Sequence, residues 1–137
     1  AKKIERQNIQ NILLMRERGQ FIDEYLPHKS MDCMHINFPD PWSKKARRKH
    51  RILSAEFLSK MHPHFRSKGE LRFKTDHLEY FETVTDILQD LKTYTIIEHT
   101  TDLHRSEYNE NNILTEFEML FKSKENPPIG FLRAEVL

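Results

Sequence analysis

A carboxylate held between two prolines is the group in this sequence best suited to chemistry. Asp40 lies between Pro39 and Pro41, directly after the apolar segment 31–38, which is predicted to be a buried strand. Each proline fixes its own φ and disfavours helical backbone in the residue before it. Asp40 is therefore expected in a rigid, extended loop just beyond a strand end, where open α/β sheets bind their ligands. A turn-forming role for an Asp beside proline is the alternative.

A dense cationic run follows this loop. Residues 44–51 contain six Lys or Arg side chains, whereas the whole chain has a net charge of only +1. Because the positive charge is local, the sequence predicts a docking patch for phosphates, with a solvated charged loop as the alternative. Trp42, which precedes the run, can stack on a base, but packing beneath the loop is the commoner use of an indole. The residues expected to contact nucleic-acid phosphates are Lys44, Arg47, Arg48, Lys49 and Arg51.

The composition limits the class of protein. At 137 residues, with 37% hydrophobic and 31% charged residues, the chain is expected to form one globular domain. No apolar run approaches the roughly 20 residues of a membrane span, and the first residues lack the apolar centre of a signal peptide. A single cysteine, Cys33, excludes an intrachain disulfide and favours the reducing cytoplasm. No spacing of His, Cys or carboxylate residues indicates a metal site.

Apolar spacing predicts the elements that position these groups. Strands and helices alternate along most of the chain, which is typical of an α/β fold with a mostly parallel sheet and helices on both faces. Ser54 is the expected N-cap of a helix, and Lys68 and Gly69 form a turn. The last two strands, joined by a turn at 126–128, are expected to form an antiparallel edge. Helices are predicted at 20–26, 55–62 and 78–91, and strands at 11–17, 31–38, 70–75, 94–98, 114–122 and 130–137.

Glycines are few and widely separated, at positions 19, 69 and 130. A dinucleotide or adenosyl site in a doubly wound fold normally begins with a glycine-rich turn between a strand and a helix. That turn is absent from this sequence, which also begins in the middle of an element. We therefore expect residues 1–137 to be a single partial domain, the C-terminal portion of a larger one, whose N-terminal βαβ unit is missing.

Three motifs, taken in order, resemble those of the bacterial tRNA (guanine-N7)-methyltransferase family. They are Phe-Pro-Asp-Pro-Trp at 38–42 with the cationic run after it, Lys-Thr-Asp at 74–76, and Thr-Glu-Phe-Glu at 115–118. The segment 11–17 also matches the one that precedes the first motif in the family. The resemblance covers essentially the whole chain and implies a Rossmann-like class I methyltransferase. It further implies S-adenosyl-L-methionine as cofactor and the variable-loop guanosine of tRNA, position 46, as substrate.

The resemblance also implies roles for single residues. Asp40 is expected to be the catalytic carboxylate, adjacent to the cofactor, and Glu17 stands where the family usually has an Asp at the adenine end of the cofactor. Asp76 is expected to contact tRNA, with a helix N-cap as the alternative. Glu116 replaces a frequent Lys, which argues against a phosphate contact, but Glu116 or Glu118 is a candidate acceptor for the edge of an extruded guanine. The remaining expected tRNA contacts are Lys44, Thr115, Glu116, Phe117 and Glu118.

Functions of more than one class fit these residues. The first is the substrate-binding and catalytic portion of a tRNA guanine-N7 methyltransferase. The second is a non-catalytic module that docks structured RNA through residues 44–51. A third, an amino-group methyltransferase, has an Asn/Asp-Pro-Pro-aromatic loop similar to 39–42, but the cationic run and residues 115–118 fit it poorly. The sequence leaves the oligomeric state open.

Overall fold

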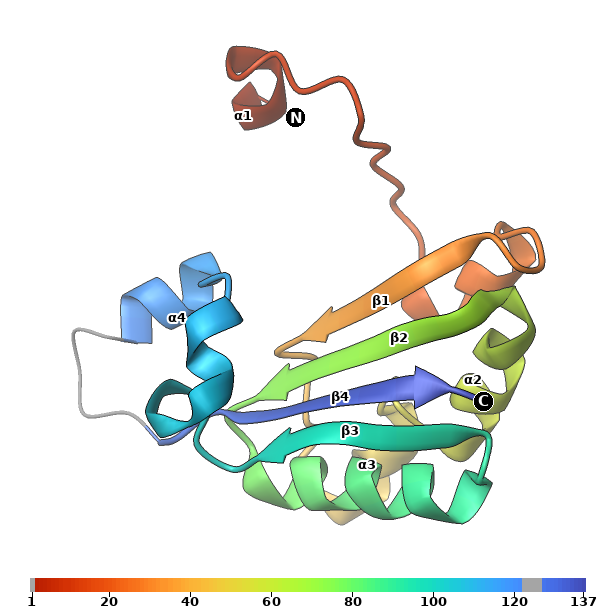
Figure 1. The fold of residues 1–137 in the computed structure, drawn as a ribbon, viewed down its shortest axis with the longest axis vertical. Helices are drawn as coiled ribbons and strands as arrows, with labels where there is room; N and C mark the ends of the chain where they lie inside the picture. Colours follow the sequence, from red (N-terminus) through yellow and green to blue (C-terminus); the bar gives the residue numbers. More distant parts are fainter. Residues whose placement is uncertain (1, 122–126) are drawn as a thin grey trace.

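A twisted sheet organises the chain in a computed structural model that describes residues 2–121 and 127–137. Within these residues the sheet has four strands, in the order β1-β2-β4-β3 (Figure 1). β1 and β2 pair in parallel, whereas β4 runs antiparallel to both β2 and β3. The α/β class is confirmed. The antiparallel strand was predicted at the edge of the sheet, but it lies inside the sheet. The strands are β1 Met31–Asn37, β2 Phe65–Thr75, β3 Tyr94–Thr100 and β4 Gly130–Val136.

The described residues also form four α-helices and five short 3-10 helices, of which α1 and η1 precede the first strand. The strand predicted at 114–122 is wrong, because Glu116–Phe121 form helix α4. The strand predicted at 11–17 is also wrong, and the turn predicted at 126–128 begins at Asn126, which lies outside the described residues. The α-helices are α1 Lys2–Arg6, α2 Ala55–Met61, α3 Leu78–Leu91 and α4 Glu116–Phe121. The 3-10 helices are η1 Gly19–Glu24, η2 Lys45–His50, η3 His62–His64, η4 Leu103–Arg105 and η5 Glu107–Asn111.

Two features of local sequence fix where these elements begin and bend. Ser54 caps α2 as predicted, since its hydroxyl accepts a hydrogen bond from the Phe57 N–H at 3.2 Å. The turn predicted at Lys68 and Gly69 is instead an irregularity inside β2. Lys68 has a φ of 62°, and the pairing with β1 shifts register nearby, so the chain kinks but stays in the sheet.

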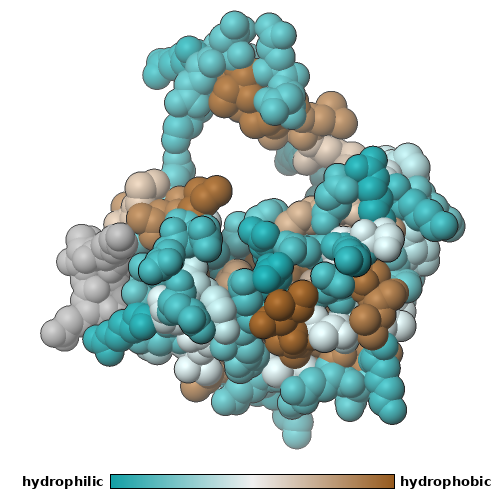
Figure 2. Space-filling view, in the orientation of Figure 1, coloured by the Kyte–Doolittle hydropathy of each residue, from teal (hydrophilic) through white to brown (hydrophobic). Residues whose placement is uncertain are grey.

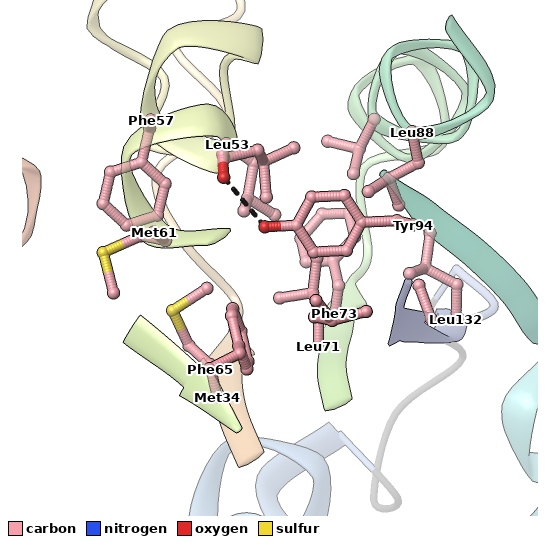
Figure 3. Packing of buried hydrophobic residues seen from close by; sticks show 14 of the residues in the cluster. Met34, Leu53, Phe57, Met61, Phe65, Leu71, Phe73, Leu88, Tyr94 and Leu132 are labelled. Atoms are coloured by element: carbon pink, nitrogen blue, oxygen red, sulfur yellow. Dashed lines mark hydrogen bonds between the residues drawn. The ribbon is translucent and has the colours of Figure 1, made fainter. Parts of the chain in front are cut away.

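The main hydrophobic core lies between one face of the sheet and helices α2 and α3. Alternate strand residues point to this face, as the period of two in a strand requires. Buried rings from β2 and α3 meet here, with Phe73 5.5 Å from Tyr80 between ring centroids. Tyr94 satisfies its buried hydroxyl by donating to the Leu58 carbonyl oxygen at 2.8 Å, the dashed line in Figure 3. Members of this core include Met34, Phe57, Met61, Leu71, Phe73, Tyr80, Leu88 and Leu132.

The opposite face of the sheet is charged. Glu70 accepts hydrogen bonds from Arg72 and Arg133, and Arg133 also donates to Glu98 at 2.8 Å. Partial burial raises the pKa of Glu70, but the hydrogen bonds and positive charges of Arg72 and Arg133 together outweigh it, so the pKa is lowered. Polar residues dominate this side of the molecule in Figure 2. The prediction of helices on both faces is therefore wrong for the described residues, in which α2 and α3 share one face.

The N-terminal segment runs away from the sheet, and α1 lies at its far end (Figure 1). Its apolar side chains are exposed, and Leu13 exposes 93% of its surface. A strand requires a hydrogen-bonded neighbour, and this segment has none among the described residues. That is why its apolar run forms no strand. No helix in the described part of the chain is long and apolar enough to cross a membrane.

Candidate active site

The loop after β1 holds Asp40 in a tightly defined backbone. The Asp40 Oδ1 atom accepts a hydrogen bond from the Trp42 N–H at 2.9 Å. Asp40 therefore does form a turn, through one of its two carboxylate oxygens. Its Oδ2 atom has no hydrogen bond to a described residue, and the side chain is exposed. Phe38 and Trp42, which flank the Pro-Asp-Pro segment, have φ values of 50° and 44°. Such left-handed backbone at bulky residues is costly and is concentrated at functional sites.

Arg51 anchors this loop to helix α3. Its side chain is only 5% exposed, its Nε donates to the Pro41 carbonyl oxygen at 2.7 Å, and both terminal nitrogens bind Glu79. The guanidinium also lies 4.5 Å from the centroid of the Tyr80 ring. The hydrogen bond from Arg51 lowers the pKa of Glu79. These contacts argue against Arg51 as a phosphate contact, because its buried guanidinium already makes three hydrogen bonds within the fold.

Replacing this anchor is expected to loosen the loop. Arg51→Lys keeps the charge but loses the forked geometry, and we expect a fall of about 1–2 kcal/mol in the free energy of unfolding. Urea unfolding at pH 7 measures it. Arg48→Lys is the matched control, because Arg48 binds the same Glu79 at 3.1 Å from the exposed side and should change little. Equal effects of the two substitutions would contradict an anchoring role for Arg51.

The rest of the cationic run is exposed on and around η2. Lys44, Arg47 and Lys49 have no ion pair with a described residue. Arg48 shares the Glu79 carboxylate but still exposes 44% of its side chain. The structure thus leaves four of the five predicted phosphate-binding residues available to a ligand, next to the Asp40 loop.

The end of β2 lies beside this loop. The Phe38 N–H donates to the Lys74 carbonyl oxygen at 2.8 Å, and Ser43 Oγ lies 3.3 Å from His77 Nε2. His77, and not Asp76, is the N-cap of α3, because its Nδ1 accepts from the Tyr80 N–H at 3.2 Å. The Asp76 carboxylate makes no hydrogen bond to a described residue. It is half-buried and available at the carboxyl end of the parallel pair.

A buried polar network ties α4 to the same strand end. Glu118 is fully buried, and its Oε2 accepts from Lys74 Nζ at 3.1 Å and from the Thr115 N–H at 2.8 Å. Its Oε1 lies 3.1 Å from both His104 Nε2 and Asn112 Nδ2. Because both oxygens are engaged and buried, the structure argues against Glu118 as an acceptor for guanine and leaves Glu116 as the other candidate. Glu118 instead positions the segment that carries Thr115.

The charge state of Glu118 follows from these contacts. Burial by itself raises the pKa of its carboxyl. The hydrogen bonds from the Thr115 backbone, Asn112 and Lys74 outweigh burial and lower the pKa to about 2. Thr115 Oγ1 also accepts from the Glu118 N–H at 3.1 Å. Thr115 and Glu118 therefore form a capping box at the start of α4, a signal that sequence reasoning missed.

The other two residues of the third motif lie at the surface. Phe117 packs against Phe38 with ring centroids 4.4 Å apart, which joins the first and third motifs across almost 80 residues of sequence. Phe38 also packs on a second small core of Leu103, Ile129 and Phe131. Glu116 forms an exposed ion pair with Lys3 of α1. Because the negative charge of the Glu116 carboxylate repels phosphate, this position is poorly suited to a phosphate contact.

Glu17, the residue predicted to lie at the cofactor, borders a pocket beside the start of the sheet. The Glu17 carboxylate is exposed and accepts from the Arg18 N–H and the Tyr25 hydroxyl. It borders an apolar pocket of about 250 Å³ that is also lined by Met34 and Ile36 of β1. The three glycines sit against neighbouring side chains, Ile52, Phe65 and Phe81, and none has a positive φ. They are packing glycines, so no glycine turn for a cofactor exists in this chain. No three His, Cys, Asp or Glu residues in the described ranges converge as metal ligands.

Comparison with known sequences agrees with this arrangement. Residues 1–129 match a protein family described as "Putative methyltransferase". A tRNA (guanine-N(7)-)-methyltransferase of Mycoplasma pneumoniae is 39% identical over 114 residues, which are 82% of this chain and 54% of that protein. A bifunctional glycosyltransferase/methyltransferase of Fusobacterium nucleatum is 39% identical over 132 residues, 96% of this chain and 20% of that protein. The chain therefore spans about half the length of the tRNA methyltransferase and a fifth of the bifunctional protein.

Solved structures show the same fold at low sequence identity. An rRNA methylase of Streptococcus thermophilus has a TM-score of 0.57 at 14% identity, over 99% of this chain and 64% of that one. A "putative methyltransferase" of Streptococcus mutans in complex with SAH has a TM-score of 0.59 at 16% identity, over 99% and 67%. The Rossmann-like fold implied by the resemblance is confirmed. Because residues 1–129 match the family described as "Putative methyltransferase", this chain belongs to that family.

Proposed function

We propose that this chain carries the substrate-binding and catalytic part of an S-adenosylmethionine-dependent tRNA guanine-N7 methyltransferase. One observation supports it above the others: motifs far apart in the sequence converge at the carboxyl end of β1 and β2. The Phe38 N–H binds the Lys74 carbonyl, the Phe38 ring packs on Phe117, and Lys74 binds Glu118. The loop that follows Phe38 carries the exposed Asp40 carboxylate and leads into the exposed cations of residues 44–49, a combination that suits a nucleic-acid base and its phosphates. The names of several relatives point to the same substrate.

The proposed chemistry requires little proton transfer. Guanine N7 carries an in-plane lone pair, and S-adenosylmethionine supplies a methyl group bound to a positively charged sulfur. Because the purine becomes cationic as N7 is alkylated, a fixed carboxylate beside it lowers the barrier by electrostatic stabilisation. Asp40 is suited to this task, since one oxygen is held by the Trp42 N–H and the other is open. Asp76 and the cations of residues 44–49 would orient the RNA.

Chemical mapping of the methylated base tests the proposal. The complete polypeptide that contains residues 1–137 is incubated with S-adenosylmethionine and a tRNA transcript. Borohydride reduction followed by aniline cleavage then breaks the RNA strand only at N7-methylguanosine. We expect a single cleavage in the variable loop, at guanosine 46, and none in a transcript with adenosine there. Methyl transfer without this cleavage would overturn the N7 assignment, and no transfer to tRNA would overturn the substrate.

A non-catalytic RNA-docking module is the second candidate. It is favoured by the glycines of this chain, which pack against neighbouring side chains and form no cofactor turn. Calorimetric titration of the complete polypeptide that contains residues 1–137 with S-adenosylhomocysteine distinguishes the two. Binding at micromolar concentration supports the methyltransferase. Binding of tRNA without binding of S-adenosylhomocysteine supports the docking module.

A further inference from the structure

A groove lined by Trp42 shares the cations Arg47 and Lys49 with the site described above but does not include Asp40. It has a volume of about 930 Å³ and lies between η1, the cationic η2 and helix α2. Asp40 is not among the residues that line it, so a base held against the Asp40 carboxylate lies outside this groove. We call it the Trp42 groove. Its cationic and aromatic lining residues include Arg18, Phe21, Trp42, Arg47, Lys49 and Lys60.

The Trp42 groove combines free cations with accessible aromatic rings. Arg18, Arg47 and Lys49 have no side-chain partner among the described residues, and the groove's one carboxylate, Glu56, is paired with Lys60 at 3.2 Å. Phe21 exposes 43% of its surface although it is fully apolar. Cations that track a phosphate backbone beside rings that stack on bases are the recurring signature of single-stranded nucleic-acid sites.

The position of the indole is built into the loop. Trp42 keeps a left-handed φ of 44°, which is rare for a bulky residue, and the Asp40 carboxylate holds its N–H in that turn. The indole lines the groove and touches the His50 ring, with centroids 5.3 Å apart. The same turn therefore fixes the groove wall and Asp40. Trp42 therefore connects the groove to the Asp40 loop.

We propose that the Trp42 groove binds an unstacked nucleotide of single-stranded RNA next to the base that is methylated. Its base stacks on Phe21 and Trp42, and its phosphate binds Arg18 and Arg47. This inference rests on the proposed function, because RNA is the ligand of both. It adds Arg18 and Phe21, which no motif identifies, to the RNA-binding surface. Since this surface prefers an open strand, it would favour a substrate loop over a helical stem.

Trp42 is the only tryptophan in the chain, so its fluorescence reports on the groove directly. The probe is 5′-phosphorylated hexaadenylate, titrated into the 137-residue chain, with a blunt RNA duplex of equal length as comparison. We expect saturable quenching by the single strand and much weaker quenching by the duplex. Phe21→Ala and Arg18→Ala are each expected to raise the dissociation constant about tenfold.

Matched substitutions outside the groove serve as controls. Tyr25→Ala removes an aromatic ring that is 53% exposed at the end of η1, and Arg66→Ala removes an exposed cation from the start of β2. Both should leave hexaadenylate binding unchanged. Equal effects of groove and control variants, or equal quenching by duplex, would overturn the inference. If tRNA binds and hexaadenylate does not quench, the groove assignment fails alone; if neither RNA binds, the proposed function fails with it.

Discussion

Asp40→Asn is expected to lower the turnover number of the proposed methyltransferase by about 100-fold or more, with little change in tRNA affinity. Asparagine keeps an oxygen that can accept the 2.9 Å hydrogen bond from the Trp42 N–H, so the turn should be preserved. The substitution removes only the negative charge. Methyl transfer to a tRNA transcript under single-turnover conditions, in the complete polypeptide that contains this chain, measures the effect.

A second substitution separates charge from loop structure. Asp40→Ala removes both the charge and the turn, so it should also disturb Trp42 and the groove that the indole lines. If Asp40 served only the turn, Asn would retain activity and Ala would lose it. An Asn variant within about threefold of the wild-type turnover would therefore contradict the electrostatic role. Circular dichroism and tRNA binding verify that each variant is folded.

The carboxylate loop was predictable because its determinants are local. Two prolines around Asp40 restrict the backbone whatever the rest of the fold does, and the apolar run before them forms β1 as predicted. Helix α3 and the Ser54 cap of α2 are likewise confirmed, since apolar spacing and capping residues act over a few positions. The exposed cations of residues 44–49 follow directly from composition.

The sequence-based predictions differ from the structure where the environment of a residue depends on parts of the chain that are distant in sequence. The apolar pattern of 130–137 predicts a strand but carries no information on its neighbours, and β4 lies between β2 and β3. Arg51 and Glu118 have the same residue types as exposed ligands, and only the fold shows that Glu79 and Lys74 pair with them. The helix at Glu116 was within reach of sequence reasoning, because Thr115 and Glu118 have the spacing of a capping box.

The Lys74–Glu118 pair should have the largest effect on stability of any ion pair in the described residues. Glu118→Gln leaves Lys74, whose side chain is 10% exposed, without its carboxylate partner. We expect a loss of about 3 kcal/mol in the free energy of unfolding at pH 7, because breaking a buried ion pair leaves the remaining charge buried without a partner. Urea unfolding measures the loss, and glutamine can still serve the capping box, so the helix itself is preserved.

The dependence on pH has a definite direction. The pKa of Glu118 is about 2 in the folded protein, below its ordinary value of 4.5. A depressed carboxyl pKa contributes stability that is complete above the unfolded pKa and is lost as the pH falls through the folded one. The difference between wild type and Glu118→Gln should therefore be constant from pH 7 to about pH 5.5 and shrink steadily toward pH 2. A difference that is independent of pH would contradict the charged network.

Two further variants identify the cause of that loss. Glu116→Gln is the matched control, because Glu116 lies on the same helix with its side chain 74% exposed and should give no measurable change. Adding Lys74→Met to Glu118→Gln removes the stranded ammonium and should recover part of the stability. Because Lys74 lies in β2 beside Asp76, and Glu118 holds Thr115, the pair couples two of the three motifs. A double variant that is stable but binds tRNA poorly would show that the pair positions the RNA-binding surface as well as stabilising the fold.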